Sequence, residues 1–259
     1  MIRVRLAGWL LVCCVSLSCS VAASAGDAST PIARSSLLNR SVCASAIEEA
    51  EQQHGLPQGL LQAISVVESR RHPHALNLGP EQGALYPDRR EDAHGLILDA
   101  LSRGERPMVG CLQVNVAIHA PQDPGWALNP RRAANWAAFY LATHARAAGS
   151  LDAAWPAAVM RFNGARGAAA NRYVCRVAGA LNGLGHIRTE WLILSNLSLD
   201  SDQARRRCET SWRQGFATAE ALKTPLERQA SLPMITMHFI SLAIPAEEEP
   251  PLPSEMPQD

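Results

Sequence analysis

Apolar residues recur at helical spacing along most of the chain. Leu60, Leu61, Ile64 and Val67 form one such stripe, and Trp136 and its neighbours form another after Asn129-Pro130. The same spacing predicts helices over 42–53, 57–69, 91–102, 129–148, 168–181 and 203–212, and one more helix that carries Trp155, Val159 and Phe162. Strand-like alternation is scarce, and aromatic residues make up only 5% of the chain. The sequence therefore predicts a mainly α fold.

Local residues set the expected helix boundaries. Ser41 is a suitable cap for the helix over 42–53, and Pro57 suits the first turn of the next one. Pro73 forbids much continuation, so that second helix is expected to end near Glu68-Ser69, and residues 72–89 are expected to form a loop. For the helix that carries Trp155, Ser150 as a cap and Pro156 as the first turn remain alternatives.

The two ends of the chain differ from its middle. Residues 1–25 have the pattern of a secretory signal, with two early arginines, an apolar run and a small-residue cleavage site. Residues 26–40 are expected to form a leader, 41–183 the helical domain, and 184–244 a partly helical extension. Residues 245–259 are rich in Pro and Glu, which is typical of a disordered tail.

Composition and charge narrow the possible functions. The chain has 24 basic and 24 acidic residues, and removal of Arg3 and Arg5 with the signal leaves 22 against 24. A chain without positive surplus is not expected to bind nucleic acid, because such binding needs basic groups that displace counterions. No later segment is long and apolar enough to predict a stable membrane span after signal cleavage. The expected location is the periplasm or cell envelope.

Four cysteines remain after the signal, and an exported protein can form disulfides. They allow three pairings, among which sequence does not choose. We expect Cys43 to pair with Cys175 or Cys208, whereas Cys111, in an apolar stretch, is equally compatible with a buried free thiol. Neither the cysteine spacing nor the histidines give a metal pattern, and no cofactor is expected.

Glu68 is the strongest candidate for chemistry. It follows five residues of apolar or small character at the predicted end of a helix. A helix C-terminus disfavours negative charge, and partial burial would do the same, so both raise the carboxyl pKa toward that of a general acid. Most glutamates are simply exposed, and from its position alone an ordinary surface role is the alternative.

The residues after Glu68 strengthen the case. Glu68-Ser69 is followed by Pro73, then by Gly110-Cys111-Leu112-Gln113, then by Phe162-Asn163-Gly164, and last by Tyr173 with Val174 and Val177. This order resembles the soluble lytic transglycosylase (SLT) and goose-lysozyme-like family over roughly residues 43–182. The resemblance implies a lysozyme-like helical domain with an active-site cleft, and a murein lytic transglycosylase acting on peptidoglycan glycan strands.

The resemblance also implies roles for single residues. Glu68 would be the catalytic acid and base, and Ser69 would shape the end of its helix. The remaining implied substrate-binding positions are Gly110, Gln113, Asn115, Phe162, Asn163 and Tyr173. Gln113 would contact sugar groups, Asn163 would lie beside the glutamate or hold nearby backbone, and Tyr173 would bond a sugar or a loop carbonyl.

Two features depart from the family pattern. Phe162 stands where the family has a tyrosine that contacts the catalytic carboxyl, so Glu68 would need packing or another donor. Pro73 and Gln113 are forty residues apart, a longer interval than usual, and it holds an extra predicted helix. Small proteins of this family often accompany conjugation, secretion or pilus machines, so components of such machines are expected partners.

In the implied mechanism, one glutamate protonates the bond between MurNAc and GlcNAc and then deprotonates the sugar 6-hydroxyl, which gives 1,6-anhydroMurNAc. Most glycosidases instead use two carboxylates. One alternative is a hydrolytic muramidase on the same scaffold. Another is a catalytically inactive glycan-binding or assembly factor, for which Phe162 would be a sign of decay.

Overall fold

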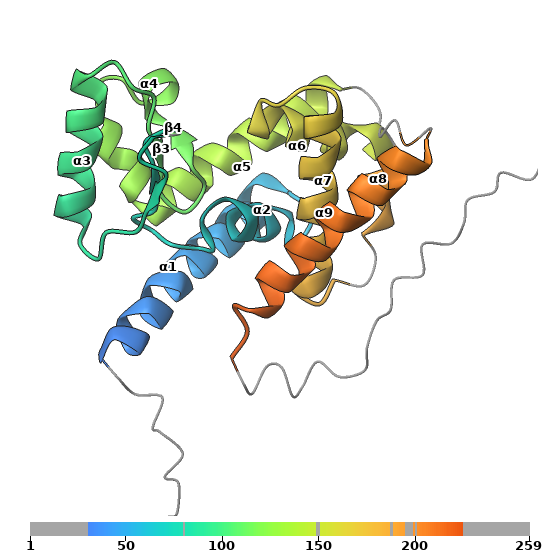
Figure 1. Ribbon diagram of the computed structural model, residues 1–259, viewed down its shortest axis with the longest axis horizontal. Helices are drawn as coiled ribbons and strands as arrows, with labels where there is room; N and C mark the ends of the chain where they lie inside the picture. The colour runs from blue at the N-terminus through green and yellow to red at the C-terminus, as the bar shows by residue number, and fades with distance from the viewer. Residues whose placement is uncertain are drawn as a thin grey trace, which may run out of the picture.

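The computed structural model describes residues 31–79, 81–148, 151–186, 189–194, 199 and 201–224. Over these residues the chain is mainly α-helical with one small sheet, which confirms that the fold is mainly α (Figure 1). The predicted signal peptide, the Ser150 cap and the Pro/Glu-rich tail lie outside the described residues. The helices are α1 (Pro31–His54), α2 (Leu60–Ser69), α3 (Arg90–Ser102), α4 (Val116–His119), α5 (Pro130–Ala147), α6 (Leu151–Asn163), α7 (Ala168–Gly183), α8 (Glu190–Leu194) and α9 (Asp202–Glu220), with a 3-10 turn η1 (Pro124–Leu128).

Several predicted boundaries are confirmed. Helices α3, α5 and α7 begin within one residue of their predicted starts, and the Asn129 side chain caps α5 by accepting from the Arg132 backbone N–H at 3.1 Å. Two starts were wrong. Helix α1 begins at Pro31, a residue suited to a first helical position, so Ser41 lies inside it. Helix α2 begins at Leu60, after Gly59 at φ 82°, so Pro57 precedes it.

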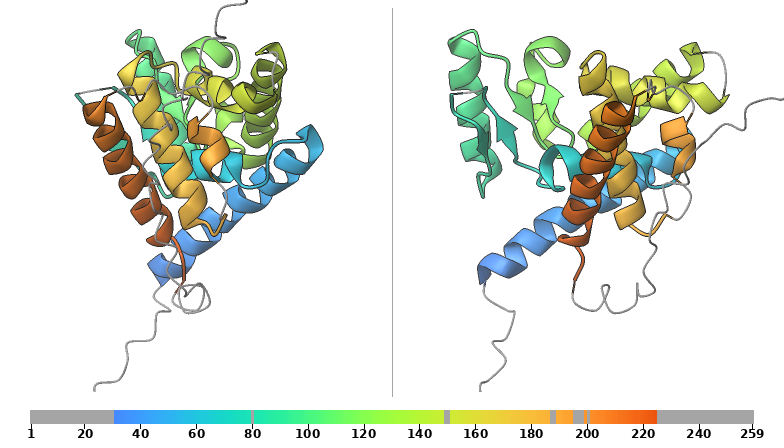
Figure 2. Two further views of the ribbon diagram at one scale, coloured as in Figure 1. Left: turned by 90° about the vertical axis from the view of Figure 1, so that its right-hand side faces the viewer. Right: turned by 45° about the vertical axis from the view of Figure 1, so that its right-hand side comes forward.

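Helices α2 and α7 form the centre of the larger lobe. Their buried residues belong to one hydrophobic core together with parts of α1, α5, α6, α8 and α9. Helix α9 lies along α7 in both views of Figure 2. A Cβ atom on Gly179 would lie 1.9 Å from the Trp212 carbonyl oxygen, and one on Gly215 would lie 1.9 Å from that of Arg176. Glycine at both positions therefore permits this approach, and part of the predicted extension packs on the helical domain.

The smaller lobe contains a four-stranded antiparallel sheet. The strands are β1 (Leu76–Asn77), β2 (Ala84–Leu85), β3 (Met108–Val109) and β4 (Val114–Asn115), in the order β2-β1-β3-β4. Two of them lie in the segment 72–89 that was expected to be a loop, because two-residue strands leave no alternating pattern in the sequence. Helix α3 covers this lobe, which has its own hydrophobic core. Trp136 of α5 packs against both cores and so joins the lobes.

Two disulfides cross-link the fold, and their pairing corrects the sequence expectation. Cys43 bonds to Cys111, and Cys175 bonds to Cys208. Cys111 is therefore not a free thiol, and Cys43 pairs with neither of its two expected partners. The pairing depends on which helix faces meet: α1 packs near the turn after β3, while α7 packs on α9. Spacing along the chain carries no record of those contacts.

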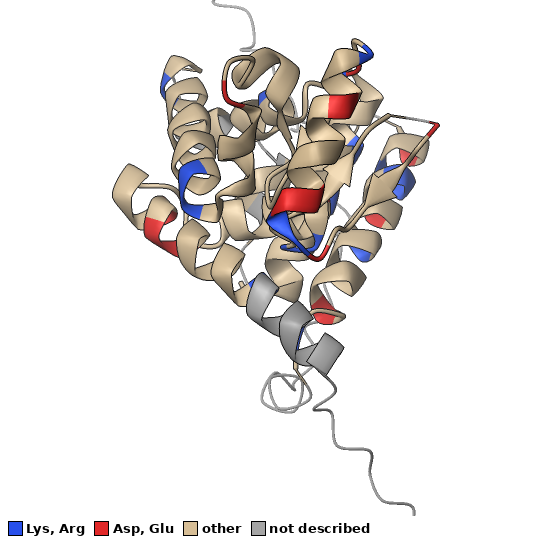
Figure 3. Cartoon of the chain, turned by 90° about the vertical axis from the view of Figure 1, so that its left-hand side faces the viewer, with Lys and Arg blue, Asp and Glu red and all other residues tan. Residues whose placement is uncertain are grey.

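The helices and the surface charges of the described residues give two coarse observations. None of the helices in the described ranges has the length and apolar character needed to cross a bilayer. Figure 3 shows acidic and basic residues interspersed over the face that it draws. Many belong to exposed ion pairs such as Arg89 with Asp92, and such pairs contribute little to stability.

Candidate active site

Glu68 lies in the last turn of α2 and is half-buried. The Tyr173 hydroxyl donates a hydrogen bond of 2.5 Å to its Oε1 atom. Burial raises the pKa of this carboxyl from 4.5 to about 7, while the bond from Tyr173 and the charge of Arg176 act in the opposite direction. Removal of water is therefore the dominant effect, and near neutral pH Glu68 exists in both protonation states.

The two groups that face Glu68 come from one side of α7. Tyr173 and Arg176 are three residues apart, so they are neighbours on the helix surface. Tyr173 is only 5% exposed, and burial together with the nearby carboxyl raises its pKa well above 10. The phenol thus keeps its proton and acts as a permanent donor to Glu68. Arg176 was not among the predicted residues, although its spacing from Tyr173 is a signal that could have found it.

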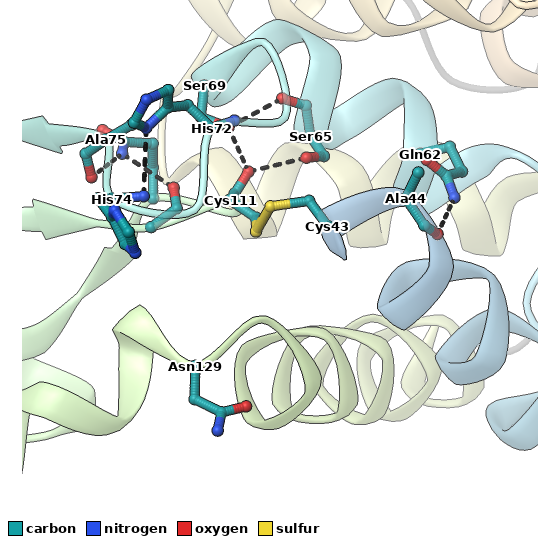
Figure 4. The surroundings of a disulfide bond; sticks show 12 residues. Cys43, Ala44, Gln62, Ser65, Ser69, His72, His74, Ala75, Cys111 and Asn129 are labelled. Carbon is teal, nitrogen blue, oxygen red and sulfur yellow. Dashed lines mark hydrogen bonds between the residues drawn. A yellow bond between two sulfur atoms is a disulfide. The ribbon is translucent and has the colours of Figure 1, made fainter. Parts of the chain in front are cut away.

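The predicted glutamine turn lies directly against the end of α2. Ser65 and Ser69 both donate hydrogen bonds from Oγ to the Cys111 carbonyl oxygen, at 2.9 and 2.7 Å (Figure 4). The Ser69 hydroxyl also accepts from the His72 backbone N–H at 3.2 Å. Ser69 therefore connects the end of α2 both to the turn and to the chain that leaves the helix.

Gly110 and Gln113 build that turn. Gly110 is buried with φ 78°, and a Cβ there would lie 2.3 Å from the Ala127 carbonyl oxygen, so this position requires glycine. Gln113 is 8% exposed, and its Nε2 donates to the carbonyl oxygens of Ala75 and Gly110, both at 3.2 Å. The side-chain nitrogen is thus engaged by the protein, and the amide oxygen is the atom that remains for a ligand.

The other predicted site residues make no hydrogen bond to Glu68 within the described ranges. Asn115 ends β4, and its buried Oδ1 has no hydrogen-bond partner among the described residues. Asn163 is exposed at the end of α6, and within the described part of the chain no hydrogen bond joins it to Glu68. The Phe162 ring lies against Tyr140, with centroids 6.2 Å apart. The donor to Glu68 is Tyr173, a role that the sequence reading had not given it.

Phe162 belongs to a row of ring contacts that includes Trp136 and Tyr140, two residues that the sequence analysis treated only as part of an apolar helix face. Tyr140 contacts Trp136, His144 and Phe162, with centroids 5.3, 4.3 and 6.2 Å apart. Trp136 also contacts Trp126 and His119, at 5.9 and 4.8 Å. These rings are half-buried apart from the exposed His119. The spacing of Trp136, Tyr140 and His144 at every fourth residue of α5 is the signal for this row.

A second buried carboxylate, Glu51 of α1, also escaped the sequence reading. Its oxygens accept from the backbone N–H groups of Gly59, Leu61 and Gln62 at 2.8, 2.6 and 3.0 Å. Glu51 thus supplies the cap that α2 lacks from its own Gly59. Burial raises its pKa, and the three backbone bonds oppose that rise.

Two surface hollows lie away from Glu68. One, of about 500 Å³, lies between the start of α2 and the end of α9 and includes Glu51, Arg71 and His186. The other, of about 560 Å³, lies between α1 and the start of α5. The described residues contain no group of three or more His, Cys, Asp or Glu side chains that could hold a metal.

No family model, curated protein or solved structure matches this chain.

Proposed function

We propose that this protein is an exported murein lytic transglycosylase with a lysozyme-like helical domain, and that Glu68 is its catalytic acid and base. The observation that carries the proposal is the half-buried Glu68 carboxyl with a pKa of about 7 and a phenol donor at 2.5 Å. A carboxyl of that kind holds a proton near neutral pH and, because it is half-buried rather than enclosed, a substrate can reach it.

In the first step, protonated Glu68 donates its proton to the oxygen between MurNAc and GlcNAc as the glycosidic C–O bond breaks. The positive charge that develops at the sugar carbon is neutralised by the substrate's own N-acetyl oxygen. In the second step, ionised Glu68 removes the proton of the sugar 6-hydroxyl, whose oxygen forms the new C–O bond of 1,6-anhydroMurNAc. Glu68 ends the cycle protonated, and no water is consumed.

Only one carboxyl contributes to the proposed chemistry. In the part of the chain that is described, the groups that alter the Glu68 pKa are a phenol and a guanidinium, with no second carboxylate among them. Two-carboxylate glycosidases place their acidic groups within about 10 Å of each other. A single carboxyl with a pKa close to neutrality can serve as acid in the first step and as base in the second.

Tyr173 compensates for Phe162 in this proposal. The family tyrosine that contacts the catalytic carboxyl is replaced by Phe162, yet a phenol still reaches Glu68 from α7. This contact argues against the reading of the protein as an inactive glycan-binding factor. The tyrosine hydroxyl stabilises the ionised form of Glu68 that the second step needs, since it lowers the carboxyl pKa.

Other groups of the described chain also suit a glycan. The Gln113 amide oxygen can accept a hydrogen bond from a sugar hydroxyl, and the half-buried rings of Trp136 and Tyr140 offer flat apolar faces to sugar C–H groups. We further propose that the enzyme acts in the periplasm, where it opens the wall locally around a secretion, conjugation or pilus machine.

Zymography on purified sacculi tests the activity. The wild-type protein is expected to clear murein, Glu68→Gln to clear none, and the control Glu49→Gln to behave as wild type. Glu49 is a suitable control because it is an exposed glutamate whose ion pair with Arg131 lies at the surface. Equal clearing by Glu68→Gln and wild type, or no clearing by a folded wild-type protein, would refute the proposal.

A further inference from the structure

We propose that the Cys43–Cys111 disulfide is a positioning element for Glu68, acting through the Cys111 carbonyl oxygen and the two serine hydroxyls that bond to it. The proposal rests on the proposed function of Glu68 as the reactive carboxyl. It concerns how the chain holds that carboxyl in place. The disulfide would do so through Cys111, which is more than forty residues after both serines in the sequence.

The two cysteines connect α1 to the turn that faces α2. Cys43 is fully buried and Cys111 is 1% exposed, with 68 residues between them along the chain. Figure 4 shows the disulfide beside the Cys111 carbonyl, toward which the Ser65 and Ser69 hydroxyls point from α2. The bond between α1 and the turn therefore fixes the one acceptor that both hydroxyls share.

The serines lie four residues apart, one helical turn from each other, and Glu68 lies between them in the sequence. A single carbonyl thus holds two successive turns of α2 on the same face. Both hydrogen bonds are buried, so the loss of the Cys111 acceptor leaves the Ser65 hydroxyl without this partner and the Ser69 hydroxyl with only the Ser65 carbonyl oxygen at 3.3 Å as acceptor. Displacement of the Cys111 carbonyl would loosen the last turn of α2, which carries Glu68.

The end of α2 needs such a support. The helix ends in two consecutive non-glycine residues with positive φ, Arg70 at 55° and Arg71 at 60°. This backbone conformation costs roughly 1 kcal/mol or more per residue and persists where neighbouring structure enforces it. The Ser69 hydroxyl, bonded to the Cys111 carbonyl and to the His72 N–H, holds the chain on both sides of this strained pair.

The second disulfide offers a matched comparison. Cys175 and Cys208 join α7 to α9, which already pack closely through Gly179 and Gly215. Cys175 is two residues from Tyr173, and residues so spaced point to different sides of a helix. Loss of this disulfide removes a cross-link of the same kind without touching the Ser65–Ser69 anchor.

The test is a ¹³C NMR titration of the Glu68 carboxyl, assigned by comparison with Glu68→Gln. The variants are Cys43→Ser/Cys111→Ser, the control Cys175→Ser/Cys208→Ser, and Ser65→Ala/Ser69→Ala with both disulfides intact. The charged and titratable groups that face Glu68 are Arg176 and Tyr173, and they are unchanged in all variants. No substrate is used, so the outcome is independent of whether the protein cleaves murein.

Because burial is the main cause of the high Glu68 pKa, a loosened helix end admits water and lowers it. We expect the Cys43/Cys111 and Ser65/Ser69 variants to shift the Glu68 titration from about 7 toward 4.5, while the control variant stays near 7. A variant that combines the Cys43/Cys111 and Ser65/Ser69 substitutions should show no further shift, since both sets act through the Cys111 carbonyl. If the Cys43/Cys111 variant does not fold, the serine variant decides. An unchanged titration in a folded Cys43/Cys111 or Ser65/Ser69 variant would overturn the proposal.

Discussion

A glutamate that is buried or half-buried lies at each end of α2, and the two differ in the groups that donate hydrogen bonds to them. At the beginning of the helix, Glu51 accepts three backbone hydrogen bonds and is 4% exposed. At the end, half-buried Glu68 accepts one bond from a phenol. Burial raises both pKa values, but the backbone donors oppose the rise at Glu51.

The comparison shows that hydrogen-bond donors decide how far burial raises a carboxyl pKa. The Glu51 oxygens accept hydrogen bonds from N–H groups at a helix N-terminus, where negative charge is favoured. The ionised carboxylate can make these bonds without a proton. Glu68 lies at the C-terminus of α2, where negative charge is disfavoured, and it is only half-buried. The first glutamate is therefore expected to act in folding and the second in chemistry, and single substitutions can separate these roles.

Glu68→Gln is expected to have the largest effect. The amide has the shape of the acid but cannot transfer the proton, and general acid–base groups contribute roughly 10²–10⁴-fold to rate. We expect a loss of sacculus-clearing rate in that range, with a cooperative unfolding transition retained. Turbidity assays and circular dichroism measure the two properties. A rate within a factor of two of wild type would remove Glu68 from the mechanism.

Glu51→Ala is expected to lower stability and to leave the clearing rate nearly unchanged. Three backbone N–H groups, two of them in buried bonds, lose their acceptor, and at about 1 kcal/mol each the free energy of unfolding should fall by roughly 3 kcal/mol. The clearing rate per folded molecule should remain close to wild type. Urea denaturation gives the first quantity, and the rate below the unfolding transition gives the second. A stable but inactive Glu51→Ala protein would contradict the assigned roles.

Tyr173→Phe should give a smaller loss with a diagnostic pH shift. It removes a hydrogen bond to a charged group, of order 2 kcal/mol, which corresponds to roughly a 30-fold loss of rate. Because Tyr173 lowers the Glu68 pKa, its removal should raise it. The alkaline decline of the rate, expected near pH 7 in wild type, should move to higher pH. A decline that stays in place would show that the phenol does not act on Glu68.

The pH dependence of stability gives the smallest effect. The Glu68 pKa is near 4.5 unfolded and about 7 folded, so the folded state holds a proton that the unfolded chain releases in this interval. Wild-type stability relative to Glu68→Gln should therefore be greatest below pH 4.5 and fall as pH rises through about 7. With allowance for the exposed part of the residue, the fall should be about 1–2 kcal/mol. Parallel denaturation curves at pH 5 and 8 measure it, and equal differences at both would contradict the raised pKa.

The sequence was informative where the determinants are local. The apolar stripe before Glu68 and the proline after it predicted a carboxyl at a helix end, and Asn129-Pro130 predicted the start of α5. The bond from Tyr173 to Glu68 spans 105 residues, and the Glu51 cap joins different helices, so neither leaves a local pattern. The Cys43–Cys111 pairing likewise depends on tertiary packing, and the expected pairing was wrong.

The most direct test of the central claim is digestion of purified sacculi in H₂¹⁸O, followed by mass spectrometry of the released fragments. One carboxyl acting with the sugar's own hydroxyl predicts unlabelled 1,6-anhydroMurNAc ends that disappear with Glu68→Gln. Reducing ends that carry ¹⁸O would instead show that water is the nucleophile and would contradict the account.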